Sequence, residues 1–479
     1  MHHSAVLTWA AEQGSTALSV EAVKWWCAKN GALDRNALQA GYDDGTICKL
    51  EHPSKGLILA DLKALEGEVR TAAWLGGKAP RALRLGPALP GLTPSQVRAW
   101  NGLSAAGRAV LTGGPGTGKT KLLADLVKEL SKFRSVTLMS PTGRASAHLS
   151  KVTGLRATTI HKGFGIVKGQ TPQFNRYNPL PTDVLILDEC SMIDSWMMGI
   201  ILDGVSPHTV VFFVGDVDQI PPVEAGCPFA DMVEYGMLPT FRLEEVMRQE
   251  GREIPALAKS INEGATRFQQ SDRVIVLNGR KQEEVLIRWW NEYRGQIICP
   301  IRDSKRHCGT DAINQLIHDH NPTLGAPYGK TLRVGDRMVA LENRYDRGYM
   351  NGHLGVVTDR GLRMENGIEV KLDSKTIESE FDYSYGLTVH KAQGGEYDDV
   401  LVYLSGSRCT RQLLYTAVTR AKKRLFLGGN LSLLLRGNYK DVRTTALPAL
   451  VNQPDLIRDL LHKLDPLADL KAQADGVEW

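Results

Sequence analysis

The stretch GGPGTGKT (Gly113–Thr120) is the most informative motif in this chain. It matches the pattern G-x-x-x-x-G-K-[S/T], follows the strand-like run RAVLTG and opens the helical pattern TKLLADLVKEL. Glycines at such a turn let backbone N–H groups converge on phosphate, and the helix N-terminus adds its dipole. A chance glycine turn is the alternative. The flanking elements favour a phosphate-binding loop, with Lys119 on the β- and γ-phosphates of a nucleotide and Thr120 as a Mg²⁺ ligand.

Six more apolar runs have the texture of buried strands. Continuous apolar runs are typical of parallel strands covered on both faces. They alternate with helical patterns over more chain than one compact α/β unit needs, so we expect two parallel sheets divided around Leu243–Asn262. The runs are SVTLMS, DVLILDE, TVVFFVGD, QIICP, DDVLVYL and RLFLGG.

Two segments have a different pattern. Between Gly329 and Tyr385, apolar residues alternate with a period of two between turns, which predicts a small antiparallel β barrel inserted in the second unit. Before the Gly- and Pro-rich stretch Leu85–Pro94, two amphipathic helical patterns and the runs TICKLE and LILADL predict a helix–helix–wing module. Trp25 and Trp26 are expected to pack in its core, with base stacking as the alternative.

These changes of pattern predict the domain limits. We expect an N-terminal helical or winged-helix-like module at 1–88, a first α/β domain at 89–245 with a short hairpin insertion at about 163–181, a second at 246–445 with the barrel at about 329–385, and a C-terminal tail without clear chemistry at 446–479.

Composition sets wide bounds on function. The 479 residues are 42% hydrophobic and 23% charged, as in ordinary soluble proteins, and a net charge of +5 favours a polyanionic partner only weakly. The seven cysteines form no C-x-x-C pair, which indicates reduced thiols. The start MHHSAVLTWAAEQ lacks the pattern of a signal peptide, and no apolar run approaches the roughly 20 residues that span a bilayer. We therefore expect a soluble cytoplasmic protein without membrane contact.

Acidic and amide side chains follow two of the predicted strands. Asp188 and Glu189 end the run VLILDE, where the first carboxylate can hold Mg²⁺ and the second can orient and deprotonate an attacking water. Gln219 follows the run VVFFVGD, and its amide can contact both the γ-phosphate and the water. A solvated strand end and a plain Asx/Pro turn are the respective alternatives.

The motifs around these residues resemble those of a known family, the superfamily 1 helicases. In family order from about Leu92 to Leu427, the chain carries counterparts of the Q motif (LTPSQVRAW) and of motifs Ia (SPTGRASAHLS), Ib (ATTIHKGFG), II (LDECSMID), III (GDVDQIPPV), IV (LEEVMRQ), V (YGLTVHKAQGGEYDDVLV) and VI (LLYTAVTRAKKRL). Within that family the chain resembles the RecD/Dda-like group of superfamily 1B, and a full set of motifs in family order is a highly specific signal. The resemblance implies two RecA-like domains that hold ATP between them.

The resemblance also implies roles in the nucleotide site. Gln96 would read adenine, and Arg420 would reach across the cleft to the γ-phosphate, with Arg248 as its partner. By itself, an arginine beside lysines is as readily a solvated helix end. The catalytic set is Lys119, Asp188, Glu189, Gln219, Arg248 and Arg420, and the nucleotide contacts are Gln96, Gly113, Gly114, Pro115, Gly116, Thr117, Gly118, Lys119, Thr120 and Glu396.

Contacts to a nucleic-acid strand are carried over in the same way. Tracking without regard to sequence needs hydroxyls, amides and cations on phosphates. The inserted barrel would lie over the strand, and Phe164, Phe174 and Tyr177 near the hairpin are candidates for base contact or for core packing. The residues implied to line the strand are Pro141, Thr142, Gly143, Arg144, Thr159, His161, Lys162, Thr388, His390 and Lys391.

Two departures from the family pattern bear on strand separation. Motif V has Gly395 where the family usually has serine, and the missing hydroxyl weakens a contact to DNA or to a neighbouring motif. The segment between motifs Ib and II is short, so FGIVKG and QFNRYN would form only a small version of the hairpin that splits duplexes in the family. ATP hydrolysis is therefore the firmer expectation.

We expect an ATP- and Mg²⁺-dependent DNA helicase that moves 5′ to 3′, a direction taken from the family, on single strands and junctions in replication, recombination or repair. One alternative is a DNA-stimulated translocase that remodels protein–DNA complexes without efficient unwinding. Another is a P-loop switch or assembly factor, which leaves motifs V and VI unexplained. RNA would satisfy the same phosphate contacts. We expect a monomer whose N-terminal module contacts duplex DNA or a replication or recombination protein.

Overall fold

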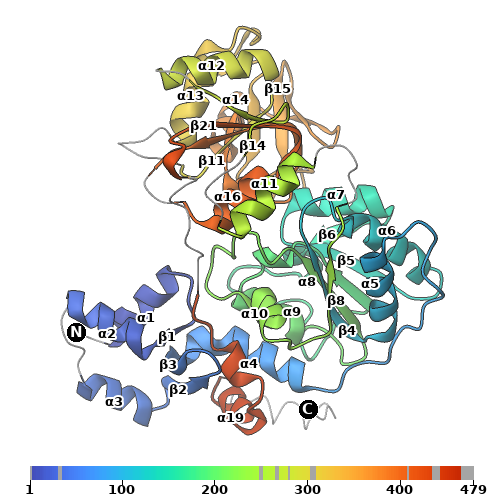
Figure 1. Cartoon of the computed structure of the whole chain (residues 1–479), viewed down its shortest axis with the longest axis vertical. Helices are drawn as coiled ribbons and strands as arrows, with labels where there is room; N and C mark the ends of the chain where they lie inside the picture. The colour runs from blue at the N-terminus through green and yellow to red at the C-terminus, as the bar shows by residue number, and fades with distance from the viewer. Residues whose placement is uncertain are drawn as a thin grey trace.

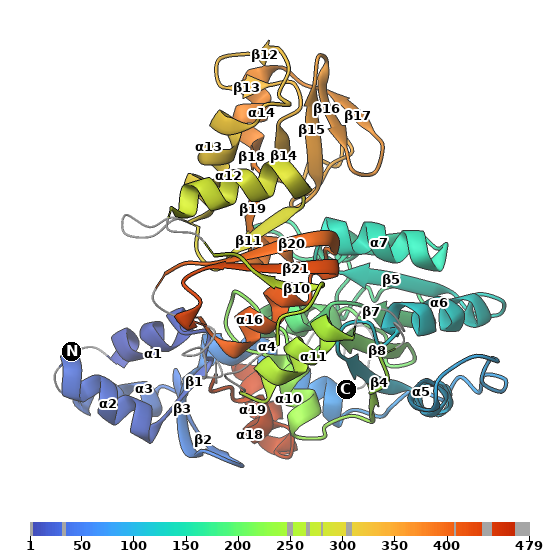
Figure 2. The same cartoon turned by 45° about the horizontal axis from the view of Figure 1, so that its top comes forward.

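The computed structural model describes residues 3–30, 35–246, 252–264, 269–278, 281–302, 309–406, 409–433 and 443–464. Two α/β domains meet face to face, and a smaller N-terminal module lies beside the first of them (Figure 1). Seen after a 45° turn, the second domain carries its inserted β-structure on the side away from that module (Figure 2).

The first α/β domain has a six-stranded sheet whose strands are all parallel. Alternate residues of β8 enter opposite apolar clusters, Phe212 on one face and Phe213 on the other, so the strand is apolar throughout. In sheet order the strands are β6 (Ala157–Thr159), β5 (Val136–Ser140), β7 (Val184–Leu187), β8 (Val210–Gly215), β4 (Arg108–Gly113) and β9 (Thr240–Leu243). The covering helices are α5 (Pro94–Ala105), α6 (Lys119–Leu130) and α7 (Gly143–Thr153) on one face, and α8 (Ile160–Phe164), η1 (Cys190–Met192), α9 (Ser195–Asp203) and α10 (Pro228–Glu234) on the other.

The second α/β domain repeats this plan with a five-stranded parallel sheet. The prediction of two RecA-like parallel-sheet domains is therefore confirmed. In sheet order the strands are β10 (Val274–Val276), β21 (Ala421–Gly429), β20 (Tyr397–Leu404), β11 (Gln296–Cys299) and β19 (Gly386–Thr388). The helices are α11 (Glu253–Asn262), α15 (Val389–Ala392) and α16 (Arg411–Val418) on one face, and α12 (Gln282–Tyr293) and α13 (Thr310–His320) on the other.

The insertion in the second domain is an open antiparallel sheet. Among the described residues, β17 and β18 are its edge strands and do not pair with each other, so the sheet does not close into a barrel. The expected barrel closure is replaced by α14, whose Ile377 is buried in the same apolar cluster as Leu362 and Phe381. In sheet order the strands are β17 (Glu369–Lys371), β16 (Gly361–Met364), β15 (Leu354–Thr358), β14 (Arg337–Ala340) and β18 (Phe381–Tyr383), with α14 (Ser374–Glu380) between β17 and β18 in sequence and a separate pair, β12 (Pro327–Tyr328) with β13 (Leu332–Arg333).

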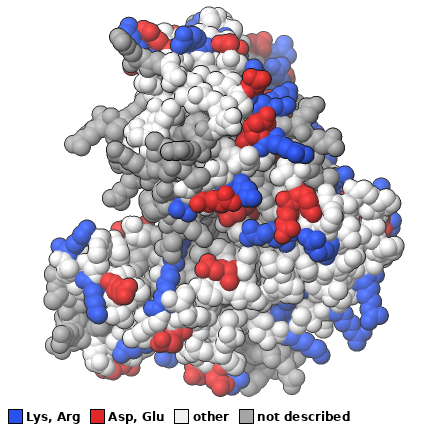
Figure 3. Space-filling model, in the orientation of Figure 1, with Lys and Arg blue, Asp and Glu red and all other residues white. Residues whose placement is uncertain are grey.

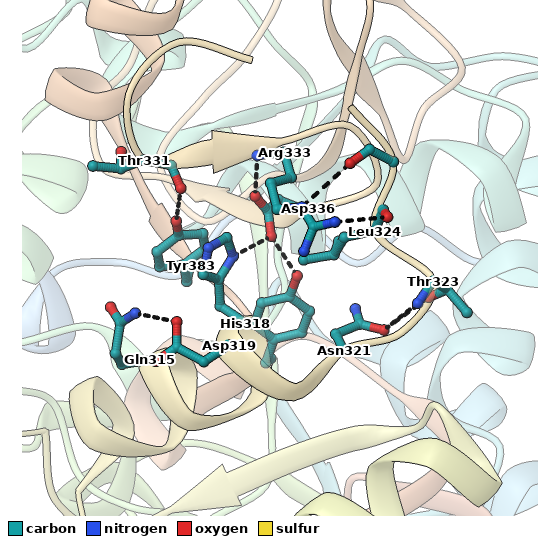
Figure 4. Close-up of polar contacts among 12 residues, drawn as sticks. Gln315, His318, Asp319, Asn321, Thr323, Leu324, Thr331, Arg333, Asp336 and Tyr383 are labelled. Carbon is teal, nitrogen blue, oxygen red and sulfur yellow. Dashed lines mark hydrogen bonds and ion pairs between the residues drawn. The ribbon is translucent and has the colours of Figure 1, made fainter. Parts of the chain in front are cut away.

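A buried carboxylate anchors this insertion on the second domain (Figure 4). Asp336 is fully buried; its Oδ1 accepts a hydrogen bond from the Tyr385 hydroxyl at 2.6 Å and lies 2.8 Å from His318 Nδ1. Its Oδ2 accepts from the backbone N–H of Arg333 at 2.6 Å. Since His318 and Tyr385 belong to the α/β domain, the carboxylate joins the two units.

The hairpin predicted at about 163–181 in the first domain has no β-strands, so this part of the prediction is wrong. FGIVKG and QFNRYN form no strands, and one backbone hydrogen bond joins them, from the Phe174 N–H to the Phe164 carbonyl at 3.3 Å. Asn175 and Asn178 exchange two more, both at 3.0 Å, in an isolated bridge. Phe164 is fully buried in the domain core and Phe174 packs against the same cluster, so these rings are used for core packing. The ring of Tyr177 remains exposed.

The N-terminal module combines a three-stranded antiparallel sheet with four helices. Trp26 is buried, but Trp25 is 50% exposed and stacks on Trp9, so the prediction that both pack in the core is wrong. Consecutive helical residues point about 100° apart, and in α2 this turns the Trp25 ring onto Trp9 at the surface while Trp26 enters the core. The elements are α1 (His3–Glu12), β1 (Ala17–Ser19), α2 (Val20–Asn30), α3 (Arg35–Asp43), β2 (Ile47–His52), β3 (Gly56–Asp61) and α4 (Leu62–Gly76).

The described part of the C-terminal segment completes this module instead of forming a separate tail. Helices α18 (Leu447–Leu450) and α19 (Pro454–Leu464) share an apolar cluster with α4 and β3. Glu68 of α4 is fully buried and accepts hydrogen bonds from the Ala446 N–H at 2.8 Å and the Ser195 hydroxyl at 3.1 Å. One carboxylate thus joins the module, the first α/β domain and the C-terminal segment.

Candidate functional site

The phosphate-binding loop has the backbone that its glycines predict. Gly116 and Gly118 have φ values of 72° and 82°, in the left-handed region that side chains rarely adopt, and Gly118 precedes the first turn of α6. Lys119 donates hydrogen bonds to the carbonyl oxygens of Gly113 and, at 3.0 Å, Gly114. Its ammonium group therefore rests on the loop itself.

A cavity of about 370 Å³ between the two α/β domains collects most of the predicted nucleotide residues. Gly113 and Thr117 do not line it, because Thr117 is buried behind the loop, where its hydroxyl donates to the Gly114 carbonyl at 2.9 Å. The lining residues include Gly114, Pro115, Gly116, Gly118, Lys119, Thr120, Asp188, Glu189, Asp216 and Gln219 from the first domain, and Gly394, Glu396, Thr419 and Arg420 from the second.

The two carboxylates after β7 have unusual surroundings. Burial and, to a lesser degree, the charge of neighbouring Glu189 raise the pKa of Asp188 to about 7, although Lys119 opposes the shift. Glu189 has a φ of 55°, a strained conformation for a residue with a side chain. Asp188 and Thr120 line the same cavity and offer the hard oxygen ligands that Mg²⁺ prefers, so the pair fits that ion.

Gln219 and Arg420 face this cavity from opposite domains. Gln219 is buried, and its side-chain oxygen has no hydrogen-bond partner among the residues that the structure describes. Arg420 is also buried; Nε donates to the Thr416 carbonyl at 3.0 Å and Nη1 to the Gly395 carbonyl at 3.3 Å. Its predicted partner, Arg248, lies outside the described residues.

Gln96, like Gly113 and Thr117, is a predicted nucleotide residue that does not line the cavity. It is fully buried, its Nε2 donates to the Thr117 carbonyl at 3.2 Å, and its Oε1 accepts from the Thr93 N–H at 3.0 Å in a capping box. The side chain braces the phosphate-binding loop in this arrangement, and adenine recognition by Gln96 stays a prediction.

A second hollow, of about 290 Å³, collects the predicted strand-lining residues. Lys162 and Thr388 stand beside it; the Thr388 hydroxyl caps α15 by accepting from the Lys391 N–H at 3.3 Å. Burial lowers the pKa of both His161 and His390, which favours neutral rings that act by hydrogen bonding. The second hollow is lined by Pro141, Thr142, Gly143, Arg144, Thr159, His161, His390, Lys391 and Gln393, together with Asn343, Asn351 and Gly352 of the insertion.

The insertion closes over this hollow, and the sequence did not point to the residues that make the contact. The Tyr345 hydroxyl lies 3.3 Å from the Thr159 hydroxyl, and the Lys162 ammonium lies 4.9 Å from the centre of the Tyr345 ring. Asn343 and Asn351 come from the same loop. They lie outside every motif, so the sequence carried no signal for them.

At Gly395, where the family usually has serine, the structure shows what takes the place of the side chain. A Cβ atom at this position would lie 2.2 Å from Nη1 of Arg144, so the guanidinium occupies the space of the missing side chain. Arg144 donates to the Tyr397 hydroxyl at 2.5 Å and pairs with Glu365 at 3.6 Å. The predicted strand contact therefore also ties the first domain to β20 and to the insertion.

Charge alone would not have located either site. Acidic and basic side chains are interspersed over the face shown in Figure 3. Within the described part of the chain, no helix is both long enough and apolar enough to cross a bilayer.

Comparisons with known proteins agree with this geometry. Residues 91–278 match the model of an AAA domain, and residues 383–427 match that of a UvrD-like helicase C-terminal domain. The chain is 34% identical over 389 residues to the ATP-dependent RecD2 DNA helicase of Deinococcus radiodurans, covering 74% of this chain and 52% of that protein. It is 32% identical over 384 residues to the RecBCD enzyme subunit RecD of Mycolicibacterium smegmatis, covering 67% of this chain and 68% of that subunit.

The chain thus spans about half the length of the RecD2 protein. Among solved structures, a Pif1 helicase from Bacteroides in complex with ADP-AlF3 and single-stranded DNA matches with a TM-score of 0.47 and 20% identity, over 78% of this chain and 98% of that one.

Proposed function

The chain belongs to the RecD-like family of superfamily 1B helicases, and on that premise we propose that it hydrolyses ATP to move along single-stranded DNA from 5′ to 3′ and to separate strands at junctions. One observation carries the proposal: Lys119 and Arg420, from different domains, line one cavity. A triphosphate between them would draw the domains together, and its hydrolysis would let them part.

The residues of the cavity have separate tasks in this proposal. Lys119 would leave the loop carbonyls and bind the β- and γ-phosphates, while Glu189 would orient the attacking water and take its proton. Gln219 would contact water and γ-phosphate, and Arg420 would offset the charge that develops on the transferred group. Mg²⁺ held by Thr120 and Asp188 would neutralise further phosphate charge.

In this proposal, the second hollow binds the single-stranded DNA. Arg144, His390 and Lys391 line it from both domains, so a change in domain spacing would shift the contacts of one domain along the strand. Replication, recombination or repair would use such a motor. A monomer is sufficient, because both halves of the cavity come from one chain.

A second candidate is a translocase that displaces bound proteins without efficient unwinding. The observation that favours it is the segment 165–181, which is described throughout and forms only the Asn175–Asn178 bridge where the family has a duplex-splitting hairpin.

Phosphate release with and without oligo-dT, together with strand displacement on forks bearing a single 5′ or 3′ tail, tests both candidates. Stimulated hydrolysis with displacement only from the 5′ tail supports the helicase. Stimulation without displacement supports the translocase. Hydrolysis that no nucleic acid stimulates would overturn both in favour of a switch.

A further inference from the structure

The loop that carries Gln219 is docked at both ends on the second domain. At its start, the Tyr415 hydroxyl donates to Oδ2 of Asp216 at 2.8 Å, a buried contact between the domains. At its end, the backbone N–H of Ile220 donates to the Thr416 hydroxyl at 2.9 Å. The side chain of Ile220 is buried in the apolar cluster of the second domain. Two consecutive residues of α16 therefore fix a loop that belongs to the other domain.

Within this loop, Asp216 also holds the backbone turn that leads to Gln219 through two hydrogen bonds. Its Oδ1 accepts from the Asp218 N–H at 3.1 Å, and its carbonyl accepts from the Gln219 N–H at 3.3 Å. Burial and the Asp216 carboxylate raise the pKa of Tyr415, so its hydroxyl stays protonated and donates. Without that hydroxyl, a buried carboxylate oxygen would lose its donor, which destabilises this turn.

The same turn of α16 holds the arginine and reaches the phosphate-binding loop. The Thr416 carbonyl accepts from Nε of Arg420 at 3.0 Å. A Cβ atom on Gly114 would come within 3.2 Å of the Tyr415 hydroxyl, so the hydroxyl stands directly behind that glycine. Tyr415 and Thr416 thus touch all three parts of the cavity that would surround a γ-phosphate.

We propose that Tyr415 and Thr416 form an interdomain latch that positions Gln219 and Arg420 together, so that the hydrolytic arrangement exists only while the domains are closed. Neither residue needs to touch nucleotide. The latch acts through Gln219 and Arg420, which would touch the nucleotide. Opening the cleft breaks the contacts of the latch at Asp216 and Ile220 together. This inference rests on the proposed ATP hydrolysis.

The test uses the full chain with Tyr415→Phe and Thr416→Val, which remove single hydroxyls and preserve shape. The kcat and KM for ATP are measured with saturating oligo-dT, alongside the affinity for a fluorescent ATP analogue. Each variant should lower the DNA-stimulated kcat about tenfold, the scale of one buried hydrogen bond to a charged or backbone group, while KM and analogue affinity change little. A change confined to KM would overturn the latch.

Tyr385→Phe is the matched control, because it removes another tyrosine–aspartate hydrogen bond of the second domain, to Asp336. Its thermal stability should fall about as far as that of Tyr415→Phe, with kcat preserved. An equal loss of kcat in the control would assign both effects to stability and overturn the latch.

A double-mutant cycle adds a readout of the contact itself. If Tyr415 acts through Asp216, the double variant Tyr415→Phe/Asp216→Asn should be no slower than the slower single variant. Independent, multiplying losses would contradict the latch. Failure of the wild-type chain to hydrolyse ATP would instead overturn the proposed function, whereas a stimulated wild type with an equally active Tyr415→Phe variant would overturn the latch alone.

Discussion

Lys119 and Arg420 line one cavity, although the first begins α6 of the first domain and the second follows α16 of the other. Lys119 rests on the carbonyls of its own loop, and Arg420 is held by Thr416 and Gly395. A phosphate that enters the cavity would therefore draw Lys119 away from its loop carbonyls and would meet Arg420 from the other domain. Because the two residues belong to different domains, single substitutions can test the role of each one separately.

Replacing the lysine should remove hydrolysis. Lys119→Ala leaves no cation on the β- and γ-phosphates, and we expect the rate of phosphate release to fall at least about 100-fold, the scale of losing one preorganised charge-stabilising donor. Lys128→Ala, an exposed position on the same helix, is the control and should hydrolyse normally. Residual activity within a few-fold of the wild type would exclude this cavity as the hydrolytic site.

Replacing the arginine should separate binding from turnover. Arg420→Ala should lower kcat on the order of 10³-fold, as for arginine fingers in other NTPases, with little change in the affinity for a fluorescent ATP analogue. Arg424→Ala is the control, because that guanidinium pairs with Asp399 at 2.6 Å, away from the cavity. Near-normal turnover in Arg420→Ala would remove this arginine from the active site.

Strand binding should depend on salt through the cations of the second hollow. Lys391 lines it and pairs with Asp382 at 3.2 Å. In Lys391→Ala, the slope of log affinity for oligo-dT against log salt should become shallower by about 0.7, the value for one lost phosphate contact on a single strand. Fluorescence anisotropy at several salt concentrations measures this, with the exposed Lys375→Ala as control. An unchanged slope would place the strand elsewhere.

Stability should depend on pH through Glu68, a buried acid whose pKa is raised by burial from 4.5 to about 7. Above pH 4.5 the unfolded chain releases a proton that the folded chain keeps, so this group's contribution to stability falls until about pH 7 and then levels off. The change is about 3 kcal/mol, from roughly 2.5 pKa units at 1.36 kcal/mol each.

Glu68→Gln resembles the neutral acid and should remove this dependence. Its free energy of unfolding relative to the wild type should rise by roughly 2.5 kcal/mol between pH 5 and pH 8 in denaturant titrations. Glu51→Gln, which removes an exposed carboxylate from the same module, is the control. A constant difference between Glu68→Gln and the wild type would refute the raised pKa.

Much of the fold was predictable because its strands are buried on both faces. The runs VLIL and VVFFV are apolar throughout, since alternate residues enter apolar clusters on opposite faces of the sheet. Short or partly exposed elements carried less signal. The strand Ala157–Thr159 and the edge strand Thr240–Leu243 were not predicted. FGIVKG and QFNRYN form no strands, and their phenylalanines pack into the domain core.

The two α/β units and the first-domain residues Lys119, Thr120, Asp188, Glu189 and Gln219 could be inferred from the sequence, because glycine spacing and apolar runs are local properties of the chain. Arg420 and Glu396 followed only from the family resemblance, and Asp216 and Thr419 were not predicted to line the cavity. Only the tertiary structure decided that Tyr415 bonds to Asp216, that Arg144 fills the space beside Gly395, and that Glu68 meets the C-terminal segment. These contacts join residues far apart in sequence and depend on how whole domains pack. No local pattern carries that information, because each partner would be an ordinary polar residue in its own segment.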